Sequence, residues 1–340
     1  MNSSKISRRS FIRSISLIAA GIYAGNGCTL SGTSRSEASK IGRYNPRRDG
    51  GCAVALGYDV DMPPGGDAYL YDRSIGWLYT DDEIAHGHLN DDIRDYINRL
   101  ASIAESYDSQ LEFFIQGNTF ERAVDTAFWK EFAKRGHAID SHMYYHDGLV
   151  ETPAEEVRYQ LARTKKLIET ELGTENIGVR GPNGYEQALR GKEDVQQAVL
   201  DVGIKWVSTQ FQYPRSDSDN DRNWINMIPK QQPFYYKTGL LEIPFAGHQD
   251  RSFFDVDMGG SPRPVDEWVA YLKGCVDIAY ERRLFLALTV HPSTSFKHDP
   301  KARYVRELLA YCRERAGIIF CTYRDMYRWI SNEKGKYPVV

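Results

Sequence analysis

The 340-residue sequence predicts an α/β fold, a distorted (β/α) barrel built from seven or eight strand and helix units. Two observations predict it. From residue 51 onward, short apolar runs alternate with longer amphipathic segments, which is typical of βαβ units, and the number of units favours a barrel over an open sheet. Polar side chains also follow several apolar runs directly, and α/β barrels collect their functional residues at this end of the strands.

The first residues are predicted to be an export signal. Arg8 and Arg9 are followed by Phe11 and by the apolar run 15–24, and this pattern resembles a twin-arginine signal, so residues 1–28 are assigned to it. The run is shorter than the roughly 20 apolar residues of a membrane-spanning helix. The resemblance implies the twin-arginine export machinery as a partner and a periplasmic or extracellular location. A general secretory signal is the alternative.

A linker is predicted between this signal and the folded domain. Residues 29–50 are rich in Ser, Gly, Arg and Asn and have almost no apolar periodicity. Cys28, just before them, is a candidate for a lipid anchor, but the residue three positions earlier does not fit that use. The folded domain then spans residues 51–340, a length that α/β barrels often reach as one domain.

The elements of the domain follow from the spacing of apolar residues. Each predicted strand is a short apolar run between polar or turn residues. In order, the strands are 53–56, 111–115, 138–139, 177–179, 206–208, 241–243, 284–290 and 318–321. The clearest helices, where apolar residues recur every three or four positions, are 91–107, 123–135, 153–172 and 265–283.

Composition excludes several classes of partner. The chain has 43 Lys and Arg against 46 Asp and Glu, a net charge of -3, which argues against nucleic acid or an anionic membrane. Cys52, Cys275, Cys312 and Cys321 lack the spacing of metal ligands. A disulfide between Cys312 and Cys321 and buried free thiols both fit the sequence. Nothing in the composition sets an oligomeric state.

Candidate catalytic and metal-binding side chains cluster after the predicted strands. Carboxylates follow the first strand, two histidines the third, an arginine the fourth and a histidine the seventh. In order, these residues are Asp59, Asp61, His142, His146, Arg180 and His291. Because parallel strands of a barrel end at one rim, we expect these side chains to lie close together.

Two carboxylates and two imidazoles are a common ligand set for a hydrolytic metal centre. We expect a helical turn to place His142 and His146 on one face, within reach of a single ion. We expect Asp59 and Asp61 to need a turn beyond the strand end before both can face the cavity. An incidental histidine pair and an Asx-turn pair of aspartates are the structural alternatives.

Four short motifs occur in the order and spacing of a known family. They are Gly57-Tyr-Asp-Val-Asp61, Gly136-His-Ala-Ile-Asp-Ser-His-Met-Tyr-Tyr-His146, Arg180-Gly-Pro-Asn-Gly184 and Leu288-Thr-Val-His-Pro292. Over residues 51 to about 330 the chain resembles the polysaccharide deacetylases of the NodB-homology, carbohydrate esterase 4 type. The Asp-x-Asp and His-x-x-x-His forms are similar to the subgroup with peptidoglycan deacetylases and ureide amidohydrolases. The resemblance implies a distorted barrel of the NodB type.

The resemblance also implies roles for these residues. Asp61, His142 and His146 would bind a divalent metal, most commonly Zn²⁺, with water at its open position. Asp59 would be the general base, and His291 would protonate the departing amine. Arg180 would hold Asp59 in its ionised form. Read without the resemblance, Arg180 would be an ordinary ion-pair partner and His291 a core histidine.

One departure from the family pattern concerns a carboxylate that relatives place near the end of the fifth strand. Residues 206–209 carry none, and Asp217 or Asp219 could replace it from the following loop. Three further residues are predicted to contact substrate at the rim, namely Pro182, His248 and Asp250.

The sequence therefore predicts an exported, metal-dependent hydrolase of a carbon–nitrogen amide bond. N-deacetylation of an N-acetylated glycan of the envelope or extracellular space is the favoured reaction. A small amide or ureide amidohydrolase is one alternative. A carbohydrate-binding relative without turnover, suggested by the missing fifth-strand carboxylate, is the other.

Overall fold

The computed structural model describes residues 46–61, 71–72, 76–77, 89–212, 221–255 and 260–340, which fall in one compact unit. The predicted signal and nearly all of the linker lie outside these ranges. The strands are β1 (Cys52–Val60), β2 (Tyr71–Asp72), β3 (Gly76–Trp77), β4 (Glu112–Ile115), β5 (Ala138–Ser141), β6 (Gly178–Tyr185), β7 (Trp206–Gln210), β8 (Phe234–Tyr235), β9 (Leu241–Glu242), β10 (Phe285–Val290) and β11 (Ile318–Cys321).

Helices occupy most of the remaining described chain. The α-helices are α2 (Pro46–Asp49), α4 (Asp91–Glu105), α5 (Ala123–Lys134), α6 (Ala154–Leu167), α7 (Glu193–Asp201), α8 (Asp221–Met227), α9 (Asp250–Phe254), α10 (Val265–Arg282), α11 (Pro292–His298), α12 (Arg303–Arg313) and α13 (Tyr323–Asn332). The shorter 3-10 and π turns are η2 (Gly117–Glu121), η3 (Ile168–Leu172), η4 (Ile228–Lys230) and η6 (Lys334–Lys336).

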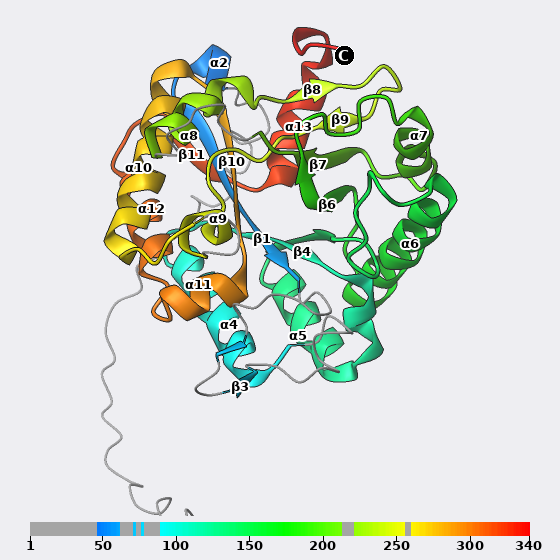
Figure 1. Cartoon of the computed structure of the whole chain (residues 1–340), viewed down its shortest axis with the longest axis horizontal. Coiled ribbons are helices and arrows are strands. Elements are labelled where there is room, and N and C mark those ends of the chain that lie inside the picture. Colours follow the sequence, from blue (N-terminus) through cyan, green and yellow to red (C-terminus); the bar gives the residue numbers. More distant parts are fainter. Residues whose placement is uncertain (1–45, 62–70, 73–75, 78–88, 213–220, 256–259) are drawn as a thin grey trace, which may run out of the picture. The chain divides into compact units, whose positions relative to one another are not determined.

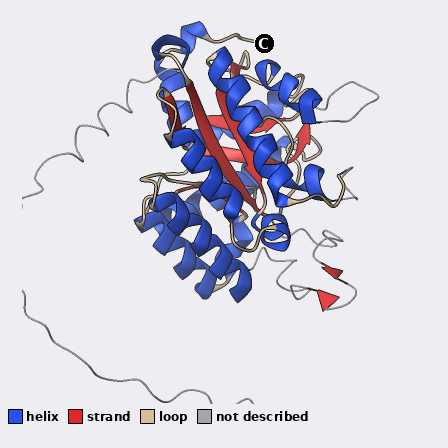
Figure 2. Cartoon of the chain, turned by 90° about the vertical axis from the view of Figure 1, so that its left-hand side faces the viewer, coloured by secondary structure: helices blue, strands red, loops and turns tan. Residues whose placement is uncertain are grey.

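The main sheet runs in the order β10-β1-β4-β5-β6-β7-β9-β8, and β11 pairs with the first half of β1. Its ladders are parallel except for β8 with β9. Figure 1 shows β1 at the centre of this arrangement, and Figure 2 shows helices on both sides of the sheet. The distorted (β/α) barrel predicted from the sequence is confirmed.

The distortion lies between β9 and β10, where no strand pairing is present among the described residues. Three contacts bridge this seam instead. Gln232 donates from Nε2 to the Phe285 carbonyl at 2.9 Å and accepts from the Phe285 amide at 3.1 Å. The Ala246 amide donates to the Ala287 carbonyl at 2.8 Å.

The predicted strands and the four clearest helices all have counterparts in the structure, with small differences at the ends. Helix α4 ends two residues earlier than predicted, near Asp108, whose φ of 53° is left-handed. Helix α6 stops at Leu167, and η3 continues it to Gly173 in π geometry. The unpredicted strands β2, β3 and β8 have only two residues each, too few to show an alternating pattern.

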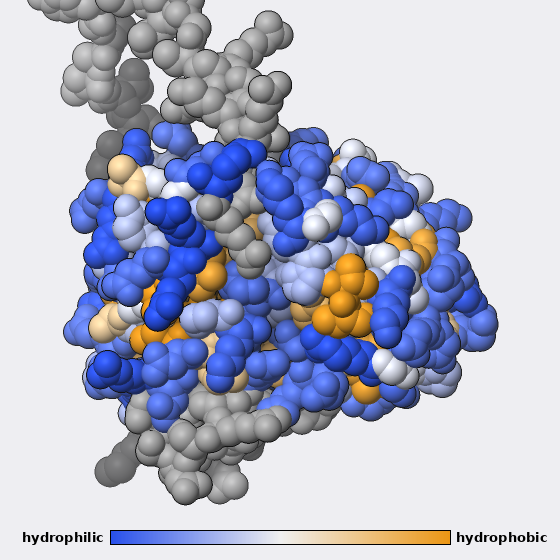
Figure 3. Space-filling model, turned by 90° about the horizontal axis from the view of Figure 1, so that it is seen from above, coloured by the Kyte–Doolittle hydropathy of each residue, from blue (hydrophilic) through white to orange (hydrophobic). Residues whose placement is uncertain are grey.

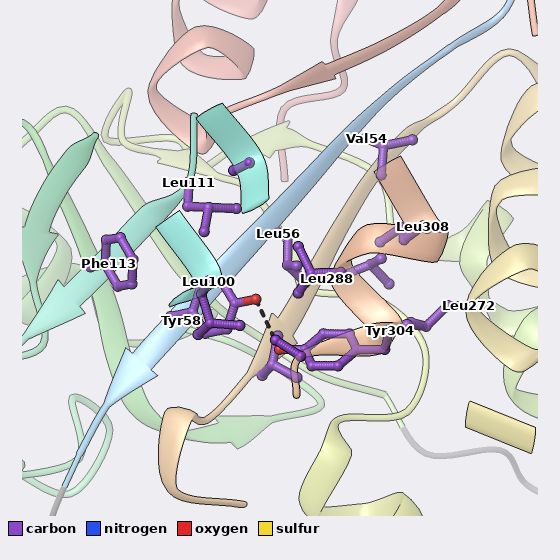
Figure 4. Packing of buried hydrophobic residues seen from close by; sticks show 14 of the residues in the cluster. Val54, Leu56, Tyr58, Leu100, Leu111, Phe113, Leu272, Leu288, Tyr304 and Leu308 are labelled. Carbon is purple, nitrogen blue, oxygen red and sulfur yellow. Dashed lines mark hydrogen bonds between the residues drawn. The ribbon is translucent and has the colours of Figure 1, made fainter. Parts of the chain in front are cut away.

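Strand β1 packs differently on its two faces. Its outward residues Val54, Leu56 and Tyr58 belong to the core beneath the helices. In this layer the Tyr58 and Tyr304 hydroxyls form a buried hydrogen bond at 2.8 Å (Figure 4). The inward residues Ala53 and Ala55 are small and belong to a second core inside the barrel. Strand alternation therefore turns the positions that follow them, up to the aspartates, toward the interior.

The described part of the chain has a largely polar surface on the face shown and buried, unpaired cysteines. The face in Figure 3 is largely hydrophilic, and its apolar side chains lie in separate patches. Within the described ranges, no helix is both long enough and apolar enough to cross a membrane. The four described cysteines are buried free thiols, so the structure holds no bond between Cys312 and Cys321.

A buried polar cluster joins α13 to the first residues of the barrel strands. Arg324 donates from its backbone to Glu112 at 3.1 Å and from Nη2 to Asp140 at 2.9 Å. Asp140 also accepts from the Ile177 and Gly178 amides. Burial raises the pKa of Glu112 well above its usual value, and the Asp140 charge raises it further. Glu112 therefore keeps its proton to a higher pH in the folded protein than in the unfolded chain.

This cluster predicts how stability changes with pH. The unfolded chain releases the Glu112 proton near its ordinary pKa of about 4.3, but the folded protein keeps it. The free energy of unfolding therefore falls as pH rises above that value, by at most about 1.4 kcal/mol per pH unit. Glu112→Gln should gain stability relative to wild type between pH 5 and pH 9 in denaturant titrations. The exposed control Glu155→Gln should follow wild type, and parallel curves for Glu112→Gln would refute this account.

Candidate active site

The predicted residues meet at one end of the barrel. Asp59 is the penultimate residue of β1 and Asp61 follows the strand, while His142 directly follows β5. Arg180 lies within β6, and His291 directly follows β10. All five residues are at most 6% exposed. The carboxyl ends of parallel strands thus form the site, as barrel geometry requires.

The expectation of a turn between Asp59 and Asp61 is wrong. Strand β1 extends through Val60, four residues further than predicted. Residues two apart on a strand share a face, so both carboxylates point inward without any turn. Gly57 precedes them on the same face, and a Cβ there would lie 2.8 Å from the Phe114 ring and 2.9 Å from the Tyr323 ring. A glycine at this position makes room for the packing beside the site.

Asp61, His142 and His146 form a cluster suited to a metal ion. One ligand atom from each lies within 4.8 Å of the others. The Asp61 Oδ2 and His146 Nε2 atoms are 3.1 Å apart. Burial alone would raise the pKa of Asp61, but the charge of His291 and the hydrogen bond from His146 outweigh it, and the pKa is lowered. Asp61 is therefore an ionised carboxylate, as a ligand must be.

The orientation of His142 also fits a ligand. Its Nδ1 lies 2.8 Å from the Arg180 carbonyl oxygen, and because a carbonyl only accepts, Nδ1 carries the proton. The lone pair of Nε2 then faces the cluster, where this buried atom has no hydrogen-bond partner among the described residues. Oδ1 of Asp61 is buried and unpartnered in the same way. Burial and the neighbouring His146 lower the pKa of His142 well below its usual value, which keeps it neutral. The cluster thus offers three metal-ligating residues, and two of them have acceptor atoms without a hydrogen-bond partner among the described residues, which suits a divalent cation.

The segment that joins the two histidines is not the helical turn expected from their spacing. Met143 and His146 have left-handed φ values of 64° and 63°, and the segment is irregular. Gln160 of α6 accepts the amides of Tyr144 and Tyr145 at 3.3 and 3.2 Å and so stabilises this loop. The imidazoles still meet, with ring centroids 4.8 Å apart.

Aromatic rings hold Arg180 beside Asp59. The guanidinium is fully buried over the rings of Phe114, Phe245 and Tyr323, at 4.5 to 5.0 Å from their centroids. Its Nε lies 3.8 Å from the Asp59 Oδ1 atom. Asp217 and Asp219, considered as replacement partners, lie outside the described residues. Cation–π contacts therefore fix the guanidinium beside Asp59.

Asp59 has an acidity suited to proton transfer near neutral pH. Burial raises its pKa to about 6, against the opposing charges of Arg180 and His291. An acid that is half ionised near neutral pH both accepts and releases a proton readily. Asp59 is not part of the three-residue cluster, which leaves it free for this role.

His291 is paired with a buried carboxylate. Its Nδ1 lies 2.7 Å from Asp250 Oδ1, and its backbone amide donates to Asp250 Oδ2 at 2.8 Å. Its Nε2 is 4.0 Å from Asp61 Oδ2. Burial alone would lower the pKa of His291, but the charges of Asp250 and Asp61 raise it to about 9. The imidazolium is therefore ready to donate a proton from Nε2.

Two predicted substrate contacts have other roles in the structure. Asp250 is 0% exposed and both its oxygens serve His291, so a direct substrate contact is wrong for it. The carboxylate that pairs with His291 comes from the segment after the sixth predicted strand, Ala246-Gly-His-Gln-Asp250, and the sequence did not predict this pairing. His248 is buried against Trp224, with ring centroids 4.0 Å apart, and lies 3.2 Å from the Ser252 hydroxyl. Pro182 is also buried, and its contact with substrate stays a prediction.

Comparison with known proteins agrees with this geometry. Residues 80–207 match the profile of the polysaccharide deacetylase family, a stretch that includes His142, His146 and Arg180. A search of curated protein sequences found no match. A crystal structure assigned as a polysaccharide deacetylase from Mycobacterium smegmatis is similar at 20% identity and a TM-score of 0.63, over 84% of this chain and 93% of the other.

Two other solved structures share the fold. One is assigned as a polysaccharide deacetylase from Pseudomonas aeruginosa PAO1, at 14% identity and a TM-score of 0.62, over 85% of this chain and 95% of the other. The second is the PuuE allantoinase, at 13% identity and a TM-score of 0.61, over 85% and 94%. The fold and site thus define a hydrolase-type barrel with a candidate metal centre. Residues 80–207 thus resemble the polysaccharide deacetylase family, and the described chain shares its fold with solved structures assigned to such deacetylases.

Proposed function

We propose that this protein is a metal-dependent amide hydrolase that removes acetyl groups from N-acetylated sugars of an envelope or extracellular polysaccharide. The convergence of Asp61, His142 and His146 carries the proposal, because their ligand atoms lie within 4.8 Å of one another and two of these residues have buried acceptor atoms without a described partner. The match of residues 80–207 to the polysaccharide deacetylase family favours an acetylated carbohydrate as the substrate class. The export signal predicted in residues 1–28 supports an extracytoplasmic polymer.

The proposed mechanism assigns one task to each residue. Asp61, His142 and His146 would hold Zn²⁺, which supplies a water of pKa near 7 and polarises the acyl carbonyl. Asp59 accepts a proton as the oxygen of that water attacks the carbonyl carbon. Arg180, fixed by its aromatic rings, keeps Asp59 oriented. His291 gives its Nε2 proton to the nitrogen as the carbon–nitrogen bond breaks, since an amine leaves poorly without that proton.

Hydrolysis of a small amide or ureide is the second candidate, favoured by the fold similarity to the PuuE allantoinase. The reading as a binding protein without turnover rested on a missing carboxylate. The buried pair of Asp250 with His291 supports turnover instead, because it prepares His291 to act as an acid.

Acetate release separates these alternatives. Purified protein loaded with Zn²⁺ should release acetate from N-acetylglucosamine oligomers or from peptidoglycan, and EDTA should abolish this activity until Zn²⁺ is restored. Conversion of allantoin with no action on glycans would favour the ureide hydrolase. Glycan binding with no acetate from any substrate would favour the binding protein.

A further inference from the structure

Gln116 lies inside the candidate site, although none of the assigned roles involves it. It directly follows β4 and is extended, with φ -72° and ψ 143°. The ladders align Val60 with Ile115 and Ile115 with Ser141. One residue further along each of the three strands, Gln116 therefore stands between Asp61, which follows β1, and His142, which follows β5. The His142 amide donates to the Ile115 carbonyl at 2.8 Å, so the alignment continues past the strand ends.

The side chain of Gln116 points into the barrel. Phe114, two residues earlier, faces inward under the Arg180 guanidinium, and Ile115 belongs to the outward core. Alternation then returns Gln116 to the inward face. The next residue supports this direction, because a Cβ on Gly117 would meet Thr164 of α6 at 2.4 Å.

The Gln116 carboxamide is buried without a partner. The residue is 2% exposed, and its Nε2 has no hydrogen bond to any described residue. Such an unpaired buried donor is unfavourable, so most proteins avoid it unless a ligand completes the bond. Among the other unpartnered atoms of the site, those on Asp61 and His142 are acceptors that a cation would satisfy, and those on Arg180 are donors that lie beside Asp59. A cation cannot satisfy an N–H donor, which needs an acceptor atom from the substrate.

We propose that Gln116 is a substrate-contacting residue whose Nε2 donates a hydrogen bond to the carbonyl oxygen of the acyl group being removed. This inference rests on the proposed amide hydrolysis. As the water oxygen bonds to the carbonyl carbon, the π electron pair moves onto the carbonyl oxygen, and the hydrogen bond strengthens. The pair returns when the carbon–nitrogen bond breaks, with one proton taken by Asp59 and one given to the amine by His291.

The variant Gln116→Met tests this proposal because it keeps the length of the side chain and removes the donor. We expect kcat for acetate release to fall about 100-fold with KM changed less than about threefold, the effect of losing one donor to a developing oxyanion. Zinc affinity measured by calorimetry should stay within about threefold. The thermal midpoint should be unchanged or higher, because the variant buries no unpaired amide. The exposed control Gln187→Met should match wild type.

A second variant and a binding measurement complete the test. Gln116→Glu should lose activity as Gln116→Met does. If Gln116→Glu instead binds zinc more tightly than wild type and Gln116→Met binds it tenfold more weakly, Gln116 is a metal ligand and the proposal is overturned. Unchanged kcat in Gln116→Met would also overturn it. If wild type releases no acetate, the proposed function fails separately, and acetate titrated into zinc-loaded protein still tests Gln116. Binding about tenfold weaker in Gln116→Met supports the contact, and equal binding refutes it.

Discussion

Asp59→Asn should abolish turnover while the protein keeps its metal, and Asp61→Ala or His142→Ala should abolish both. Asparagine has the shape of aspartate but cannot accept the proton of the attacking water, so we expect kcat to fall by about 10²- to 10⁴-fold. Asp59 is outside the three-residue cluster, and its replacement removes no ligand. Asp61 and His142 each supply one of only three donors, so either loss should empty the site.

Metal analysis and acetate release on the same preparations check this prediction. Wild type and Asp59→Asn should each hold about one zinc ion per chain after loading and dialysis. The exposed control Asp95→Asn on α4 should be active and metal-bound. Because Asp59 is buried with a raised pKa, its ionised form is held at a cost, and Asn should not lower the thermal midpoint. Loss of zinc from Asp59→Asn would mean that Asp59 is a ligand and that the base lies elsewhere.

Asp250→Asn should impair catalysis through His291 without touching the substrate. The charge of Asp250 is the largest influence that raises the His291 pKa, so its removal lowers that pKa. His291 must be protonated to act as an acid. The alkaline limb of the rate profile should therefore move to lower pH, and kcat on an N-acetyl glycan should fall about 100-fold, near the lower end of what a positioned acid contributes.

The leaving group separates this role from simple destabilisation. 4-Nitrophenolate departs without a proton, so Asp250→Asn should hydrolyse 4-nitrophenyl acetate at close to the wild-type rate. Asp250→Glu should recover part of the glycan activity, because it restores the negative charge. An equal loss on both substrates would show that Asp250 acts only on the fold.

Much of the site could be predicted because its residues follow strands whose apolar runs are visible in the sequence. Asp59, His142 and His291 each stand within a residue or two of a buried strand end, and parallel strands end at one rim. The inward direction of both aspartates follows from strand alternation once β1 is known to reach Val60. Sequence periodicity placed the end of β1 too early, because the polar residues that follow Leu56 conceal the strand.

Other parts depend on contacts that no local pattern records. The pairing of Asp250 with His291 joins segments 41 residues apart, and a carboxylate in a loop has many potential partners. The rings around Arg180 come from three separate elements, and each is an ordinary core aromatic in the sequence. Helices α8, α9 and α11 have five to seven residues, too few for a 3.6-residue period to stand out.

The Asp250–His291 pair also joins the two sides of the seam between β9 and β10. Asp250 begins α9 on one side of the seam and His291 directly follows β10 on the other, and no ladder joins the two sides within the described residues. The hydrogen bonds between Asp250 and His291, which prepare His291 to act as an acid, therefore also hold the two sides of the barrel together at the carboxyl end of its strands. Removal of that carboxylate would break both hydrogen bonds, so the activation of His291 and the rigidity of this part of the barrel depend on the same side chain.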